Sequence, residues 1–137
     1  MADLTITAAN VIADAKARRK NGTAGATITA GQVVHVSPST GRYILSDADA
    51  TGIGAVTEFA IALNGAANGQ PLQVVLSGDL TLGTAVMTAG TDYYLSDTAG
   101  AICPRADLGA GDDVILLGVA RTAGVLKMRP IIPGVTL

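Results

Sequence analysis

Short apolar runs separated by glycine and asparagine turn signals fill the chain from residue 28 onward, and this pattern limits the fold most. QVVHV (32–36) is rich in β-branched residues, and PLQVVLSGDLTL (71–82) alternates apolar with polar positions, as half-buried strands do. The segment NGAANG (64–69) carries two Asn-Gly turn signals between such runs. No long stretch with the apolar spacing of an amphipathic helix occurs after residue 27. We therefore predict an all-β domain over residues 28–137, a small β-barrel or β-sandwich-like fold.

Two stretches of this domain are alike at an offset of 59 residues. ITAGQVVHVSPSTGRY (28–43) aligns without gaps with MTAGTDYYLSDTAGAI (87–102), with five identical positions of sixteen. The same order of elements follows in both: an apolar run, a glycine loop and an alternating strand. This order favours a duplicated β unit, with residues 28–85 and 86–137 as the two copies.

Residues 1–27 differ from the rest in pattern and in charge. LTIT (4–7) alternates like a short strand, and NVIADAKARRK (10–20) fits either a helical turn or an extended chain. Such a segment cannot build a core alone, so we predict an N-terminal arm that lies on another surface. Residues 1–20 hold four basic and two acidic residues, whereas the remainder holds five basic and nine acidic residues. A basic arm on an acidic body suits an acidic protein, a nucleic acid or only solvent.

The composition of the chain favours protein partners over nucleic acids and membranes. Only 15% of the residues are charged, against about 25% in an average soluble domain, so we expect part of the surface to be buried in a homo-oligomer or against another protein. KARRK lacks aromatic neighbours on which bases could stack, which argues against nucleic acid. The longest strongly apolar stretch, VILLGVA (114–120), is far shorter than the roughly 18 residues that span a bilayer, and we expect no membrane partner and no export signal.

Residues that carry chemistry are few, and we predict no enzyme and no cofactor. His35 is the only histidine and Cys103 the only cysteine, which leaves no multi-histidine or cysteine metal cluster. No nucleophile-elbow, zincin or phosphate-loop motif is present. Cys103, between Ile102 and Pro104, fits a buried small hydrophobe.

Two loops are rich in carboxylates. Asp47 and Asp49 lie in SDADATG, and Asp112 and Asp113 lie in GAGDDV. Oxygen-rich loops suit calcium, but neither spacing matches an EF-hand. Solvated turns are the main interpretation, and a weak cation site at Asp47/Asp49 or Asp112/Asp113 is the alternative.

Four phrases carry a resemblance to a known family: LTITAANV (4–11), GTAGATITAGQVV (22–34), STGRYILSDA (39–48) and GTDYYLSDTAGAI (90–102). With the arm, the β body and the repeat, the sequence resembles the small head decoration, or capsid cement, proteins of tailed bacteriophages. The resemblance implies a structural virion protein, assembled in the host cytoplasm, that binds the outer surface of the expanded head. It would stabilise the capsid against the pressure of packaged DNA, with the major capsid protein and other copies of itself, often as trimers, as partners.

In such proteins an N-terminal arm commonly contacts the capsid. The arm residues that this implies are Leu4, Ile6, Val11, Ile12, Lys16, Arg18, Arg19 and Lys20. Candidate interface residues are His35, Tyr43, Tyr93 and Tyr94. Tyr93 and Tyr94 point to opposite faces of a regular strand, so one ring can be core while the other lies at an interface. The alternative function is a phage fibre or surface adhesin module that binds a host glycan, for which only these three tyrosines and Phe59 could supply aromatic platforms.

Overall fold

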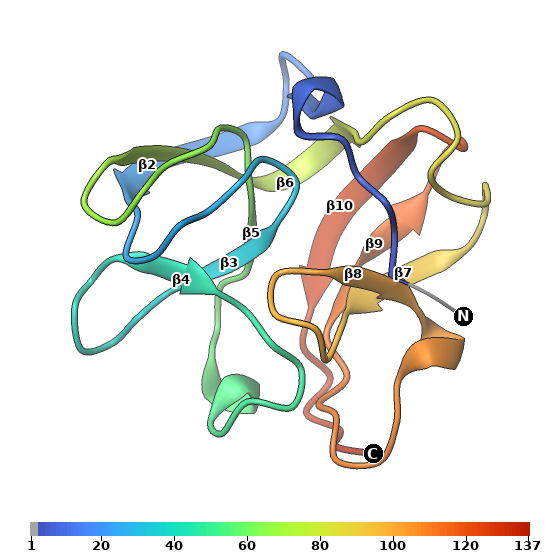
Figure 1. Cartoon of the computed structure of the whole chain (residues 1–137). Helices are drawn as coiled ribbons and strands as arrows, with labels where there is room; N and C mark the ends of the chain where they lie inside the picture. Colours follow the sequence, from blue (N-terminus) through green and yellow to red (C-terminus); the bar gives the residue numbers. More distant parts are fainter. Residues whose placement is uncertain (1–2) are drawn as a thin grey trace.

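The computed structural model describes residues 3–137 and confirms the all-β prediction (Figure 1). Within that range the ordered elements are ten strands and three short 3₁₀ turns, without an α-helix. The strands are β1 (Ile12–Ala13), β2 (Arg18–Thr23), β3 (Val33–Val36), β4 (Tyr43–Leu45), β5 (Ala60–Ala62), β6 (Pro71–Thr81), β7 (Asp92–Leu95), β8 (Ile102–Pro104), β9 (Leu116–Ala120) and β10 (Val125–Ile131). The 3₁₀ turns are η1 (Ala8–Asn10), η2 (Ile53–Ala55) and η3 (Arg105–Asp107). No helix in residues 3–137 has the length and apolarity to cross a membrane.

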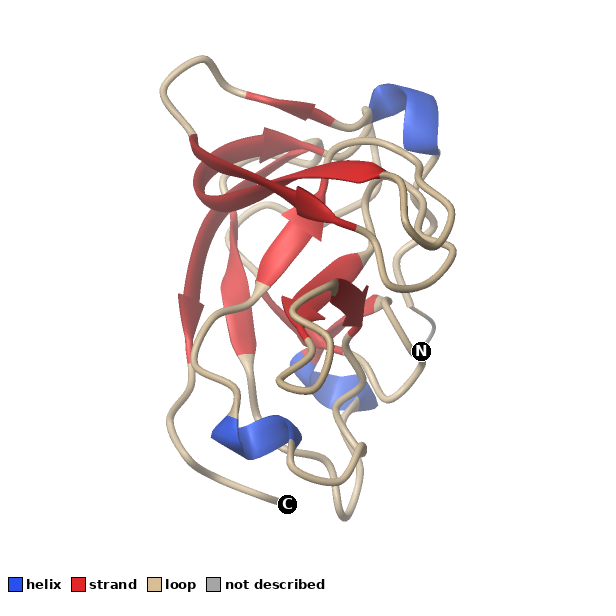
Figure 2. Cartoon of the chain, turned by 90° about the vertical axis from the view of Figure 1, so that its left-hand side faces the viewer, coloured by secondary structure: helices blue, strands red, loops and turns tan. Residues whose placement is uncertain are grey.

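The strands form one antiparallel sheet that curls into a half-barrel, as the strand-coloured view shows (Figure 2). Its order is β4-β3-β5-β6-β10-β9-β7-β8, and β1 and β2 pair with β6 in addition. β6 is the longest strand, with 11 residues, and both parts of the sheet share it. Gly78 lies inside it with φ of 111°, and a Cβ there would lie 2.8 Å from Ala17 Cα. Only glycine combines this backbone angle with so close an approach of the N-terminal segment.

The sheet contains two units of four strands with the same connectivity. In the first unit β3 pairs with β4 and β5, and β5 pairs with β6; in the second β7 pairs with β8 and β9, and β9 pairs with β10. The hairpin registers also correspond: Val36 faces Tyr43, and Leu95 faces Ile102. Both residues of the second pair lie 59 positions after those of the first, so the offset seen in the sequence holds for the paired strands.

The buried side chains form two clusters, of which only the first joins the two units. Cluster 1 lies between the units and draws on both, including Ile61 and Leu117. Cluster 2 lies within the first unit, around Tyr43 and Leu72. Because β3, β5 and β6 contribute alternate residues to the two clusters, these strands are buried on both faces.

Candidate functional site

The N-terminal segment lies on the chain's own domain. Leu4 and Ile6 pack against cluster 1, in which Val11 is buried, and the Leu4 N–H donates to the Ile102 carbonyl at 2.8 Å. β1 and β2 then pair with β6 as extended strands, so the stretch 10–20 is not an α-helix. The predicted arm therefore finds its surface within this chain. Its first two residues lie outside the described range.

Three of the eight predicted arm residues, Leu4, Ile6 and Val11, are thus used internally, whereas Ile12 is not. Its side chain is 63% exposed, the highest value among the exposed large hydrophobic residues of the described chain. It borders a hollow of about 430 Å³ that Thr81 and Val125 also line.

The four basic residues of the segment differ in their contacts. The Arg19 guanidinium donates to the backbone carbonyls of Ala13 and Asp14 at 3.0 and 3.1 Å, and so fastens the turn between β1 and β2. Lys20 Nζ lies 3.4 Å from Glu58 Oε1. Lys16 and Arg18 are exposed, and no ion pair within residues 3–137 involves either side chain. Only part of the basic run is thus free to meet a partner.

Three of the four candidate interface side chains are buried within the chain. His35, Tyr43 and Tyr93 are 8%, 3% and 4% exposed, because they pack inside the sheet rather than on its surface. Tyr94 is partly exposed, and its hydroxyl donates to Asp92 Oδ2 at 3.4 Å. The two neighbouring tyrosines therefore do divide between core and surface.

The buried rings of His35, Tyr43 and Tyr93 lie among other side chains of the core, and burial shifts the pKa of His35 and Tyr43. His35 Nδ1 lies 2.7 Å from Ser46 Oγ, and burial lowers the pKa of the imidazole. Tyr93 Oη accepts the Thr88 N–H at 2.9 Å. Burial also raises the pKa of Tyr43, with a smaller opposing effect of Lys20. The Tyr43 hydroxyl has no hydrogen-bond partner among the described residues.

Cys103 is 1% exposed, as predicted for a small core residue. Burial is the main cause that raises the pKa of its thiol to about 12. Since the thiolate is the reactive form, this cysteine is chemically quiet.

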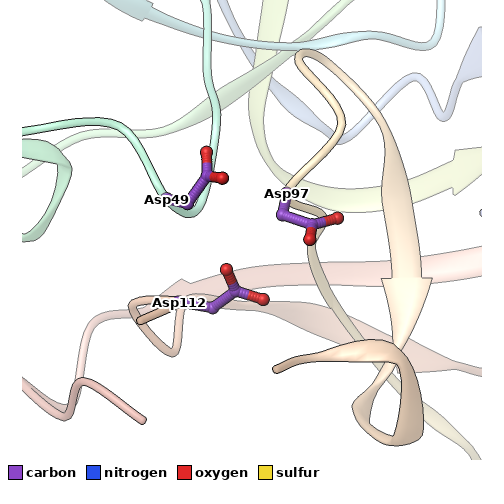
Figure 3. A group of neighbouring side chains, drawn as sticks. All are labelled: Asp49, Asp97 and Asp112. Carbon is purple, nitrogen blue, oxygen red and sulfur yellow. The ribbon is translucent and has the colours of Figure 1, made fainter. Parts of the chain in front are cut away.

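Three aspartates from separate loops meet at the seam between the units (Figure 3). Carboxylate oxygens of Asp49, Asp97 and Asp112 all lie within 4.8 Å of one another. Asp112 is buried and its Oδ2 accepts the Gly109 N–H at 2.9 Å. Nearby, burial and then contacts with Asp49 raise the pKa of Asp47 to about 6. Such a group can share protons or hold a hard cation, but exposed carboxylates also gather without one, and we assign it no function.

The structure groups these aspartates differently from the two pairs that the sequence suggested. Sequence reasoning placed Asp112 with Asp113, but the Asp113 carboxylate accepts a hydrogen bond from the Thr136 hydroxyl instead. It also missed Asp97. One signal was present: Asp47 and Asp97 each follow a Tyr-x-Leu-Ser phrase, and both phrases end a strand.

A scan against protein-family models found no match to this chain, and a search of curated proteins found none either.

Proposed function

We propose that this protein is a structural component of a tailed-phage virion that binds the outer surface of the expanded head and stabilises the capsid. Its partners would be the major capsid protein and further copies of itself, with a trimer favoured, and it would act without turnover or cofactor. The sequence phrases that resemble head decoration proteins are one support. The physical support is the exposed edge formed by β1 and β2.

The observation that carries the proposal is the position of Ile12 on that edge. β6 is the strand with which β1 and β2 pair, and Ile12 stays largely exposed beside a hollow of mixed lining, with Val125 as well as the paired Asp79 and Arg121. A strand with an unpaired side can accept a further strand from a partner, and an adjacent pocket for one of its side chains gives that contact specificity. Many identical sites on a particle then add avidity to each weak contact.

The glycan-binding alternative has less support. A sugar platform needs an exposed aromatic face, whereas Tyr43, Phe59 and Tyr93 are all buried. Tyr94 is the one aromatic ring of the described residues that is partly exposed.

The test is co-sedimentation of the purified protein with expanded, undecorated heads of the phage that encodes it. Deletion of the first 27 residues is a poor variant, because it removes Val11 and Ala24 from the two cores. Ile12→Asp is sharper, since it places a charge on the exposed edge without touching either core. Val119→Asp is the matched control, because Val119 is also a β-strand residue, 39% exposed, on β9.

We expect saturable binding at a copy number near that of the capsid protein, loss of binding for Ile12→Asp, and retained binding for Val119→Asp. Absence of binding by the unmodified chain would overturn the proposal. Equal binding by both variants would place the contact elsewhere and remove the exposed edge as its basis.

A further inference from the structure

Two arginines from distant parts of the chain line one hollow where β6 parts from β10. β6 pairs with β10 only from Gly78 to Thr81, and its earlier residues pair with β2 and β5 instead. At this fork lies a hollow of about 260 Å³, lined by Arg18 of β2 and Arg129 of β10. Both side chains are exposed, so a partner can reach them.

These arginines have no ionic partner within residues 3–137, in contrast to Lys20 and Arg121. Lys20 pairs with Glu58, and Arg121 pairs with Asp79, two residues beyond Ser77 on β6. The carboxylates of Glu58 and Asp79 are thus already engaged. Two unpaired guanidinium groups at one hollow remain available for an anion from outside.

The other walls of the hollow suit a carboxylate on a short apolar stem. Ser77 lies directly opposite Arg18 in the β2–β6 register, so the two side chains share a face of the sheet. Ser77 and Thr57 both line the hollow and bring hydroxyl donors, while Pro130 adds an apolar wall. Glu58 also lines it, but Lys20 Nζ lies 3.4 Å from Glu58 Oε1 and offsets its charge, so the two arginines stay in excess. Phe59 also lines it but is only 1% exposed, which leaves no aromatic face on which a nucleic-acid base could stack.

We propose that Arg18 and Arg129 together bind a carboxylate side chain from an acidic segment of the capsid protein. This inference rests on the proposed function, because the partner that it names is the capsid surface. The chain carries a net charge of −2, so an acidic segment is repelled by much of the molecule and attracted to this fork. The site adds an electrostatic contact to the exposed strand edge at Ile12.

The test uses Arg18→Gln, Arg129→Gln and the double variant in co-sedimentation with undecorated heads at low and high salt. Arg105→Gln is the matched control, since Arg105 is also exposed and lies on η3, outside the residues that line the hollow.

Loss of one charge-assisted hydrogen bond should weaken binding by roughly tenfold for each single variant. The double variant should lose more, and its remaining affinity should depend less on salt. Circular dichroism checks that all variants fold. Double-variant binding equal to that of Arg105→Gln would overturn the inference and leave the proposed function standing.

A second arm separates the two proposals if the unmodified chain does not bind heads. Fluorescence anisotropy would compare a short glutamate-rich peptide, its glutamine copy and a single-stranded oligonucleotide of equal length. Preference for the glutamate peptide, lost in the double variant, would uphold the carboxylate site while the capsid as its source is rejected. Equal binding of the glutamine copy, or tighter binding of the oligonucleotide through the same arginines, would overturn the site as proposed.

Discussion

The two four-strand units of this protein share one connectivity and one hairpin register but differ in how they are buried. In the first unit β5 is buried along its whole length, and β3 is buried except at its last residue. In the second unit β7 and β9 each combine buried with exposed positions, so that Val119 and Asp92 lie on the surface. Strands with the same connectivity can therefore be buried on both faces or have one face exposed to solvent.

The N-terminal segment accounts for this difference. β2 extends the first unit beyond β6, and Ala24 then forms a parallel bridge with Tyr43 of β4. The first unit is therefore nearly closed on itself and encloses cluster 2. The second unit receives only the two-residue strand β1 next to its end of β6. The six-residue strand β2 thus nearly closes the first unit, while the second unit, with the same connectivity, stays open.

The largest expected effect concerns the core that the units share. Ile61→Ala in the first unit and Leu117→Ala in the second each remove a fully buried side chain from cluster 1. We expect each to lower the free energy of unfolding by about 2–5 kcal/mol. Because cluster 1 joins both units, urea unfolding followed by tyrosine fluorescence and by amide exchange should show one transition for both variants. Separate transitions for β3–β6 and β7–β10 would show that the units fold independently.

Closure of the first unit is tested by Gly22→Ala. A Cβ at this position would lie 2.4 Å from Cε2 of the buried Tyr43 ring, so the ring or β2 must shift. We expect a loss of about 1–3 kcal/mol in stability, as for other overpacked cores. Gly109→Ala is the control, because a Cβ there meets nothing within 4 Å, and it should change stability by less than about 0.5 kcal/mol.

Hydrogen exchange localises the effect of Gly22→Ala. Amides of β2 and β4 should lose protection, while those of β7 and β8 keep it. A uniform loss over both units would show that β2 does not close the first unit specifically.

The seam between the units is tested by Asp47→Asn. The pKa of Asp47 is raised from 3.8 to about 6, so the ionised carboxylate disfavours the folded state, and stability rises as the pH falls from about 6 towards 3.8. The variant should be more stable at neutral pH by about 1 kcal/mol, after allowance for solvent screening, and should flatten this part of the profile. Thermal melts across the pH range measure it, with Asp92→Asn as the control on the exposed face of β7. An unchanged slope for Asp47→Asn would exclude Asp47 as its source.

The smallest expected effect is the pH dependence of stability that His35 causes inside the first unit, which can be compared with that of Asp47 at the seam. Burial lowers the pKa of His35 below 6.5, so the folded state disfavours the imidazolium, and stability is lost as the pH falls below 6.5. This sign is opposite to that of Asp47. His35→Gln keeps a polar group near Ser46 and should remove this loss of stability at acid pH. Chemical-denaturation curves at two pH values measure it, and an acid sensitivity equal to that of the unmodified chain would contradict it.

Sequence patterns predicted the element types well because those signals are local. Alternation in residues 71–82 and the turn residues of NGAANG act over a few positions, and β6 and its preceding loop lie where they indicate. The repeat offset also carried over to the hairpins. Prediction was weaker for the N-terminal segment, because its own sequence pattern does not indicate that it pairs with β6.

The alternating runs by themselves determined that this chain is all-β, since a period of two residues can bury one face only as a strand. Tertiary structure alone decided which strands are covered twice, which aspartates meet at the seam, and that Arg18 shares a hollow with Arg129. The physical reason is that sheet curl and strand order bring together residues more than a hundred positions apart, and those contacts depend on how the units close rather than on any local period.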